Sequence, residues 1–256
     1  MRLLVVTAVP AERDAAARGL HAANQARPTG DANVGLQRPL PGGYSLLRLA
    51  MARFGAHGAG RVDLLDAGVG QAAAAAGTAT ALTAAELAGE PYDLVVSAGI
   101  GGGFQPAAPV GSTVVADAIV AADLGAQTAE GFVPVTELGF GTARHLPPAR
   151  LSRTVADALG AGYGTVLTVS TVTGTAGSAA QLADRHPTAL AEAMEGFGVA
   201  EAAAGHQVPV LEIRTVSNTV GPRDRAAWRI GDALAALTEA FRALVPVLES
   251  EAASDG

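Results

Sequence analysis

Asn218 lies just after an apolar stretch of strand length, in the run LEIRTVSN that covers residues 211–218. A side-chain amide offers NH₂ donors and a carbonyl acceptor together, and this combination suits a purine that bears a 6-oxo group. An Asn at the end of a strand can equally cap a turn. Asn218 therefore has two interpretations, a side chain that reads a purine base or a turn cap.

Glu12 follows the first apolar stretch of the chain, in the run AVPAE of residues 8–12. A carboxylate at this point lies at the carboxyl end of a predicted strand, and open α/β folds bind their ligands at such ends. The alternative is an acid that the helix dipole favours in a first turn, with Pro10 starting the helix. Taken alone, the position of Glu12 favours the structural interpretation.

A second junction carries the run MEG, residues 194–196, just before a stretch of small residues. There Glu195 can turn its carboxylate into a pocket and accept hydrogen bonds from two vicinal hydroxyls, as a ribose presents them. The alternative is a surface acid on a helix, with Met194 filling the core. We interpret the nearby Glu192 as such a surface acid.

Four glycines stand close together in the run SAGIGGGF, residues 97–104. A loop built from them can bring its backbone close to a ligand, because no side chains intervene. The run lacks the G-x-G-x-x-G spacing and no helical pattern follows it, so a dinucleotide site is not expected. A binding loop and a simple tight turn explain the glycines equally well.

The other polar and aromatic candidates have simpler interpretations. Trp228 is the only Trp, and we expect it to pack rather than to stack on a base. We expect Arg223 and Arg225 to lie in solvent. The five histidines show no metal-ligand spacing and are interpreted as surface or structural residues: His21, His57, His145, His186 and His206.

Composition excludes several kinds of chemistry. The 256 residues contain no Cys, which removes disulfides, thiolate metal sites and a Cys nucleophile. All 17 basic residues are Arg, so a P-loop Lys and a Schiff-base Lys are excluded as well. The chain is 49% hydrophobic but only 4% aromatic, and much of the apolar fraction is Ala. We therefore expect a core of small side chains on closely packed helices.

Near-continuous apolar runs of strand length alternate with helical patterns, as expected for strands that are buried on both faces. This alternation predicts an α/β fold in a single domain, with a mixed, mostly parallel central sheet flanked by helices. We interpret residues 21–45 as a variable excursion, and the domain should span 1–248, with 249–256 as a disordered tail. The expected strands cover 3–8, 44–49, 62–67, 94–98, 113–120, 165–169 and 208–216, and the expected helices cover 11–20, 71–87, 151–159, 196–205 and 231–248.

Taken in the order in which they follow one another along the chain, the four runs 8–12, 97–104, 194–196 and 211–218 resemble the nucleoside phosphorylase and nucleosidase superfamily. The resemblance is to its methylthioadenosine/S-adenosylhomocysteine nucleosidase branch in particular. The similarity extends from Arg2 to about Leu248 and is weakest over 21–45. The Met-Glu pair is its most specific element. The resemblance implies a nucleoside phosphorylase-like fold and the cleavage of an N-glycosidic bond.

The resemblance also implies roles for individual residues. In the nucleosidases an early Glu positions and activates water, and Glu12 matches it. The Glu of the Met-Glu pair holds the ribose hydroxyls, and Glu195 matches it. A Ser-Asp pair contacts the purine in those enzymes, and here the pair is Ser217-Asn218. The residues implied to line the ribose and base pocket beside these are Gly99, Ile100, Gly101, Gly102 and Met194.

Asn218 in place of Asp points away from adenine. The wider pattern, MEGFG followed by IRTVSNTVG and a Trp, is similar to the futalosine hydrolase family. Members of that family remove hypoxanthine from futalosine in an alternative menaquinone pathway, and hypoxanthine carries the 6-oxo group that an amide suits. Futalosine also bears a benzoate on its 5′ side, for which Arg is the natural partner. The sequence leaves Arg144, Arg223 and Arg225 as candidates for this contact.

Other functions stay open. A purine nucleoside phosphorylase needs Arg with Ser or backbone amides to anchor phosphate. The turn DAGVGQAA, residues 66–73, lacks the Pro-Ser that phosphorylases of this superfamily tend to show, and Arg2 lies at the far end of the first strand. An adenine-type nucleosidase for 5′-modified substrates is a further alternative. A nucleoside-binding protein without catalysis is also an alternative, although the presence of Glu12 counts against it.

Partners and location follow from charge and from the relatives. Net charge −7 argues against a nucleic-acid groove, and no apolar run reaches the length of a membrane span. The first residues are too soon interrupted for a signal peptide, so we expect a cytoplasmic protein. We expect a small nucleoside as the substrate and no metal or organic cofactor. Relatives are commonly dimers, so a homo-oligomer, most simply a dimer, is expected.

Overall fold

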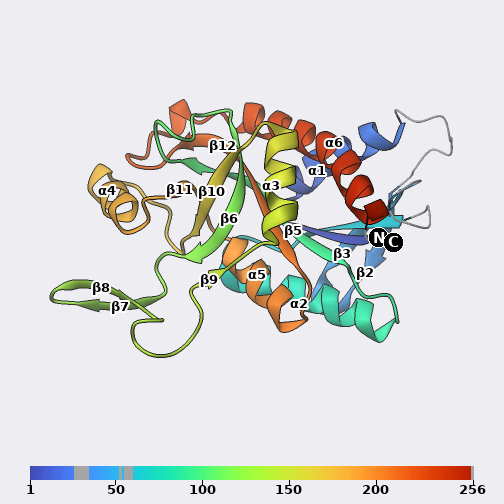
Figure 1. Cartoon of the computed structure of the whole chain (residues 1–256), viewed down its shortest axis with the longest axis horizontal. Helices are drawn as coiled ribbons and strands as arrows, with labels where there is room; N and C mark the ends of the chain where they lie inside the picture. The colour runs from blue at the N-terminus through green and yellow to red at the C-terminus, as the bar shows by residue number, and fades with distance from the viewer. Residues whose placement is uncertain (26–34, 52–53, 55–59, 255–256) are drawn as a thin grey trace.

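The computed structural model describes residues 1–25, 35–51, 54 and 60–254, without the side chains of 252–254. Its centre is a ten-stranded sheet in the order β11-β10-β6-β12-β5-β1-β4-β3-β2, with β9 paired to β6 (Figure 1). The strands are β1 (Arg2–Thr7), β2 (Leu36–Pro39), β3 (Ser45–Met51), β4 (Gly60–Asp66), β5 (Leu94–Gly103), β6 (Thr113–Ala121), β9 (Arg144–His145), β10 (Gly162–Thr168), β11 (Ala189–Ala193) and β12 (Val210–Thr219). A separate hairpin joins β7 (Gly125–Thr128) and β8 (Gly131–Pro134).

The sheet is mixed, and its central pairs are parallel. Strand β1 pairs in parallel with β4 and β5, and β5 pairs in parallel with β12. Strand β12 is antiparallel to β6, so the β6-β10-β11 group runs in the opposite direction. The end of β11 also pairs with the end of β5, which closes these five strands into a ring. This closure brings the carboxyl ends of β5, β11 and β12 together.

Helices cover both faces of the sheet, as Figure 1 shows. They are α1 (Pro10–Gln25), α2 (Gln71–Leu87), α3 (Ala149–Leu159), α4 (Ala176–Arg185), α5 (Gly196–Gly205) and α6 (Ile230–Ser254). Strand β1 shows how the sheet packs against a layer of helices on each face, because its side chains point alternately to the two faces. Leu3 and Val5 join the core with α1, α3 and α6, whereas Leu4 and Val6 join the core with α2 and α5.

Small residues allow the close helix packing that composition predicts. Gly198 in α5 faces the start of α2, and a Cβ there would lie 2.1 Å from the Gln71 carbonyl oxygen. Ala74 and Ala81 of α2 and Ala200 and Ala203 of α5 are buried in the same core. Their short side chains let the two helices pack close together, and α5 thereby holds the amino end of α2 near the strand ends.

The predicted α/β fold is confirmed, with differences at particular elements. Every expected strand and helix has a counterpart, including β3 at the expected strand 44–49. The helix α4 and the strands β2, β7, β8, β9 and β11 were not anticipated. The glycines expected in a loop form the last residues of β5 instead. Helix α6 continues through Ser254, so 249–254 are helical where we expected a disordered tail. Part of the expected excursion, 26–34, lies outside the described residues.

None of the helices in the described part of the chain is long and apolar enough to cross a bilayer.

Candidate active site

A cavity of about 310 Å³ opens where the carboxyl ends of β1, β5, β11 and β12 meet. Eight of the nine predicted site residues line it, and Gly99 lies behind them. The lining residues are Ala8, Val9, Glu12, Val69, Ile100, Gly101, Gly102, Val172, Thr173, Glu192, Ala193, Met194, Glu195, Ser217, Asn218, Val220 and Trp228. Residues that are far apart in the sequence therefore converge on one site, because the four strands end at the same place.

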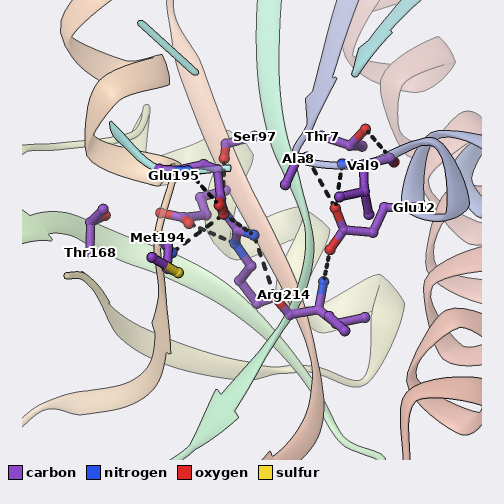
Figure 2. Close-up of polar contacts among 12 residues, drawn as sticks. Thr7, Ala8, Val9, Glu12, Ser97, Thr168, Met194, Glu195 and Arg214 are labelled. Carbon is purple, nitrogen blue, oxygen red and sulfur yellow. Dashed lines mark hydrogen bonds and ion pairs between the residues drawn. The ribbon is translucent and has the colours of Figure 1, made fainter. Parts of the chain in front are cut away.

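Glu12 is fixed in the first turn of α1 by backbone donors. Its Oε1 accepts a hydrogen bond from the Ile100 N–H at 2.9 Å, and its Oε2 accepts from the Ala8 and Val9 N–H groups at 3.0 and 3.3 Å (Figure 2). The side chain is buried. Burial raises the pKa of Glu12, and the positive charge of Arg214 opposes this shift only in part. Such a carboxylate takes a proton more readily than an exposed one.

Glu195 sits at the junction of β11 and α5, as predicted. Its Oε1 accepts from the Gly70 N–H at 3.2 Å, in the turn before α2. Its Oε2 accepts from the Met194 N–H at 3.3 Å and from Arg214 Nη1 at 3.2 Å. Three donors therefore hold the orientation of the carboxylate at the cavity, and its remaining lone-pair site, on Oε1, can accept a bond from a ligand hydroxyl.

Arg214 links these carboxylates from behind the cavity, and it is only 1% exposed. Beside its contact with Glu195, its Nε donates to Glu212 Oε1 at 2.9 Å and its Nη2 donates to Ser97 Oγ at 3.2 Å. Burial raises the pKa of Glu212. Among the described residues, Glu212 Oε2 has no hydrogen-bond partner. The guanidinium of Arg214 is therefore hydrogen-bonded to the buried carboxylates of Glu195 and Glu212, and its positive charge also acts on that of Glu12.

We did not single out Arg214 or Glu212 as site residues, although the sequence holds a signal for them. They are charged residues two positions apart in an apolar strand, so both point to the same buried face. Buried charges are normally paired, and such a pair inside a core strand indicates a built polar site. Two glycines make room for it. A Cβ on Gly196 would lie 2.2 Å from Glu212 Oε1, and one on Gly99 would lie 2.6 Å from Glu12 Oε1.

Asn218 projects into the other end of the cavity. The ladder between β12 and β5 shifts register between Val216 and Asn218. The Ser217 hydroxyl lies 2.8 Å from Asn218 Oδ1, and Asn218 Nδ2 donates to the Thr219 carbonyl oxygen at 3.1 Å. The amide oxygen is thereby engaged by the hydroxyl, while the NH₂ group keeps one hydrogen for a ligand.

Glu192 corrects one of our predictions, because it is not a surface acid. It is 5% exposed, lies on β11 and lines the cavity. Its Oε1 accepts from the Thr173 N–H at 2.9 Å, and its Oε2 accepts from the Thr173 hydroxyl. Burial raises the pKa of Glu192 as well. The surface interpretation failed because the sequence analysis had no strand at 189–193.

Trp228 is also placed differently from the expectation of simple packing. It is half-buried and lines the cavity. Arg223 and Arg225 are exposed, as expected, and each guanidinium carbon lies 6.0 Å from the Trp228 ring centroid. The loop after β12 therefore brings an aromatic face and two cations to the edge of the cavity.

Comparison with known proteins agrees with this arrangement. A family profile described as "Phosphorylase superfamily" matches residues 43–248. The chain is 66% identical to futalosine hydrolase of Streptomyces coelicolor, over 98% of this chain and 97% of the relative. The chain belongs to the phosphorylase superfamily, in its futalosine hydrolase family.

Solved structures share the fold of this family at low sequence identity. One is a 5′-methylthioadenosine/S-adenosylhomocysteine nucleosidase from Colwellia psychrerythraea in complex with adenine, at 20% identity and a TM-score of 0.75 over 97% of this chain and 96% of that chain. Another is a futalosine hydrolase mutant of Helicobacter pylori, at 14% identity and a TM-score of 0.76 over 96% of this chain and 99% of that chain. The family resemblance stated from the sequence is confirmed.

Proposed function

We propose that the chain is an N-glycoside hydrolase that cleaves futalosine into hypoxanthine and dehypoxanthine futalosine, a step of menaquinone biosynthesis. The observation that carries this proposal is a cavity lined by the buried carboxylates of Glu12 and Glu195 together with the amide of Asn218. The 66% identity to a futalosine hydrolase supports the choice of substrate. The orientation of Asn218 supports the choice of base, because its NH₂ group suits the O6 acceptor of a 6-oxopurine.

Each of the three side chains has one task in this reaction. Cleavage passes through a transition state with positive charge on the sugar ring, by analogy with glycoside hydrolysis. Glu12 takes a proton from the attacking water, a task that the raised pKa of a buried carboxylate suits. Glu195 accepts a hydrogen bond from a ribose hydroxyl. Asn218 donates a hydrogen bond to the departing base as negative charge builds on it. An amide cannot act as a general acid, so the base leaves as the hypoxanthine anion and takes its proton from solvent.

Hydrolysis is favoured over phosphorolysis by the charges around the cavity. Three carboxylates line it, those of Glu12, Glu192 and Glu195, and they repel a phosphate dianion. No Arg belongs to the described lining. Arg214 behind it is already bonded to Glu195 and Glu212, and the Gly70 N–H is bonded to Glu195. The usual anchors for phosphate are therefore occupied by the protein itself.

The 5′ benzoate of futalosine would lie near the loop after β12. Arg223 and Arg225 flank Trp228, which lines the cavity, and both are exposed. Arg144 lies on β9 and is not part of the described lining. We therefore propose Arg223 or Arg225 as the partner of the substrate carboxylate. Replacing each by Ala should raise KM for futalosine more than for inosine, which has no carboxylate.

Oligomeric state and location belong to the proposal as well. Val69 lines the cavity and yet is 58% exposed, so an apolar side chain forms part of its rim. A second copy of the chain that covers this rim would complete the site, and we propose a homodimer in the cytoplasm. Light scattering of the purified chain at micromolar concentration measures the mass directly.

The deciding experiment is incubation with futalosine, inosine and methylthioadenosine, with and without phosphate. We expect free hypoxanthine and a free reducing sugar from futalosine in phosphate-free buffer. A strict phosphate requirement with release of a sugar 1-phosphate would identify a phosphorylase instead. Calorimetric binding of futalosine without any turnover would identify a nucleoside-binding protein.

A further inference from the structure

One buried acid in the cavity has no task in the proposed reaction. Glu192 is 5% exposed and lines the same cavity as Glu12 and Glu195. It lies outside the cluster around Arg214, since its hydrogen bonds go to the backbone N–H and the hydroxyl of Thr173. A buried carboxylate costs free energy unless it is bonded, so its place beside a ligand cavity needs a reason.

The strand pairing places Glu192 beside the amide that reads the base. Glu192 pairs with Gly102 across β11 and β5, and Asn218 pairs with the same Gly102 across β12 and β5. The three residues form one row over neighbouring strands, so the Cα atoms of Glu192 and Asn218 lie about 10 Å apart, twice the strand spacing. Gly102 itself adds no side chain to this row. A Cβ there would meet Val220 Cγ2 at 2.9 Å and Asn218 Nδ2 at 3.2 Å, so the Asn218 amide lies directly beside Gly102.

A 6-oxopurine has a matching row of polar atoms. Its O6 accepts hydrogen bonds, and the neighbouring N1 carries a hydrogen and donates. A base whose O6 faces the NH₂ group of Asn218 therefore needs an acceptor next to that contact. A carboxylate has about four lone-pair sites, and Thr173 engages two of those of Glu192. The remaining sites can accept the N1–H.

We propose that Glu192 is a specificity residue that accepts a hydrogen bond from N1–H of the 6-oxopurine base. The proposal rests on the proposed function and extends it, because it explains discrimination at a second atom of the base. A 6-aminopurine has no hydrogen on N1 and presents a lone pair there, which the carboxylate repels. Together Asn218 and Glu192 read two adjacent atoms that differ between the two classes of purine.

A purely structural role for Glu192 makes a different prediction. In that case the carboxylate only anchors the loop that carries Thr173, and its loss weakens every ligand equally. The matched variant is Thr173→Val, which removes the hydroxyl contact and leaves the carboxylate in place. Glu239→Gln on the exposed face of α6 serves as the neutral control, because the ion pair of Glu239 among the described residues is with Arg242 on the same helix.

The test measures the binding of free hypoxanthine and of 1-methylhypoxanthine by calorimetry, in the full chain. We expect the parent to bind hypoxanthine about 10- to 100-fold more tightly, since the methyl group removes a hydrogen bond to a charged acceptor. In Glu192→Ala this ratio should fall to about one, and Glu192→Gln should give an intermediate ratio because its neutral carbonyl still accepts. Thr173→Val and Glu239→Gln should keep the parent ratio.

Two results would overturn the proposal. One is a parent that does not bind hypoxanthine or does not distinguish the two bases. The other is a ratio that Glu192→Ala leaves unchanged while both affinities fall together, as a loop anchor requires. Because the measurement uses free bases, it remains informative even if futalosine is not hydrolysed. Release of hypoxanthine from futalosine, assayed in parallel, shows separately whether the proposed function fails.

Discussion

The molecule buries two clusters of Arg and carboxylate side chains, and they are built in opposite ways. The Asp63 cluster, at the β3–β4 side of the sheet, surrounds one fully buried carboxylate with Arg48, Arg61 and Tyr92, and the two Arg side chains also pair with the half-exposed Glu90. Arg48 Nε and Nη2 lie 2.8 and 2.9 Å from the Asp63 oxygens, the Tyr92 hydroxyl lies at 2.6 Å and Arg61 Nε at 3.4 Å. Burial raises the pKa of Tyr92, which keeps the hydroxyl protonated as a donor.

In the Arg214 cluster the proportion of positive to negative groups is the other way round, because one guanidinium lies among the three carboxylates of Glu12, Glu195 and Glu212. Negative charge is in excess there, and burial raises the pKa of both Glu12 and Glu212. Because Glu12 and Glu212 are buried and share too little positive charge, they accept protons more readily than exposed carboxylates do. The contrast indicates that Asp63 serves folding and that the Arg214 cluster serves chemistry.

The largest expected effect on this contrast comes from Glu12→Gln. We expect kcat for futalosine to fall about 10³-fold, because an amide cannot take a proton from water. The free energy of unfolding should change by no more than about 1 kcal/mol, since the loss of one hydrogen-bond acceptor is offset by relief of the excess negative charge. Product release assays and urea denaturation measure the two quantities. Near-parent kcat would move the base to another residue.

Asp63→Asn should show the opposite pattern. Removing the carboxylate charge leaves Arg48 and Arg61 with the half-exposed Glu90 as their shared carboxylate partner and no buried one, and we expect a loss of about 3 kcal/mol in the free energy of unfolding. Because Asp63 is not part of the described cavity lining, kcat at a temperature well below the melting transition should stay near the parent value. A large loss of kcat without a loss of stability would remove the distinction between the clusters.

Asn218→Asp sharpens the comparison at the base end of the site. An ionised carboxylate repels O6, while a protonated one can serve N7 of adenine beside its amine. We expect the ratio of kcat/KM for 6-oxo over 6-amino nucleosides to fall about 10²-fold, because a site built for one hydrogen-bond pattern rejects the other. Both substrates are assayed in both proteins. An unchanged ratio would show that Asn218 does not read the base.

The smallest expected effect is the fall of kcat/KM at acidic pH, which should follow the protonation of Glu12. The base must be ionised, and burial raises its pKa above the ordinary value of 4.5, with Arg214 opposing and Glu195 adding to the shift. We therefore expect kcat/KM to decline as pH falls through that raised pKa, about tenfold per pH unit below it. The midpoint of this fall should lie above 4.5. A midpoint below that value would mean that Glu12 does not act as the base.

Much of the fold was predictable because strong local patterns agree with the tertiary structure. Strand β1 and the first half of β5 are near-continuous apolar runs, and such runs are typical of strands buried on both faces. Strand β11 was missed because three of its five residues are Ala, which carries little strand signal. Helix α4 was missed because its Gly, Ser and single buried Leu give a weak helical pattern.

The sequence alone determined the parts of the site that lie at recognisable junctions. Glu12 lies in the first turn of α1, Glu195 lies between β11 and α5, and Asn218 lies near the end of β12. The resemblance to the nucleosidases, together with the amide chemistry of Asn218, predicts their roles as base, hydroxyl ligand and base-reading amide. Only the tertiary structure decided how Arg214, Glu212 and Glu192 act. Their surroundings come from β5, β11 and β12, strands brought side by side by the closure of the sheet. Burial and charge balance depend on that assembly, and no local pattern in a single sequence records them.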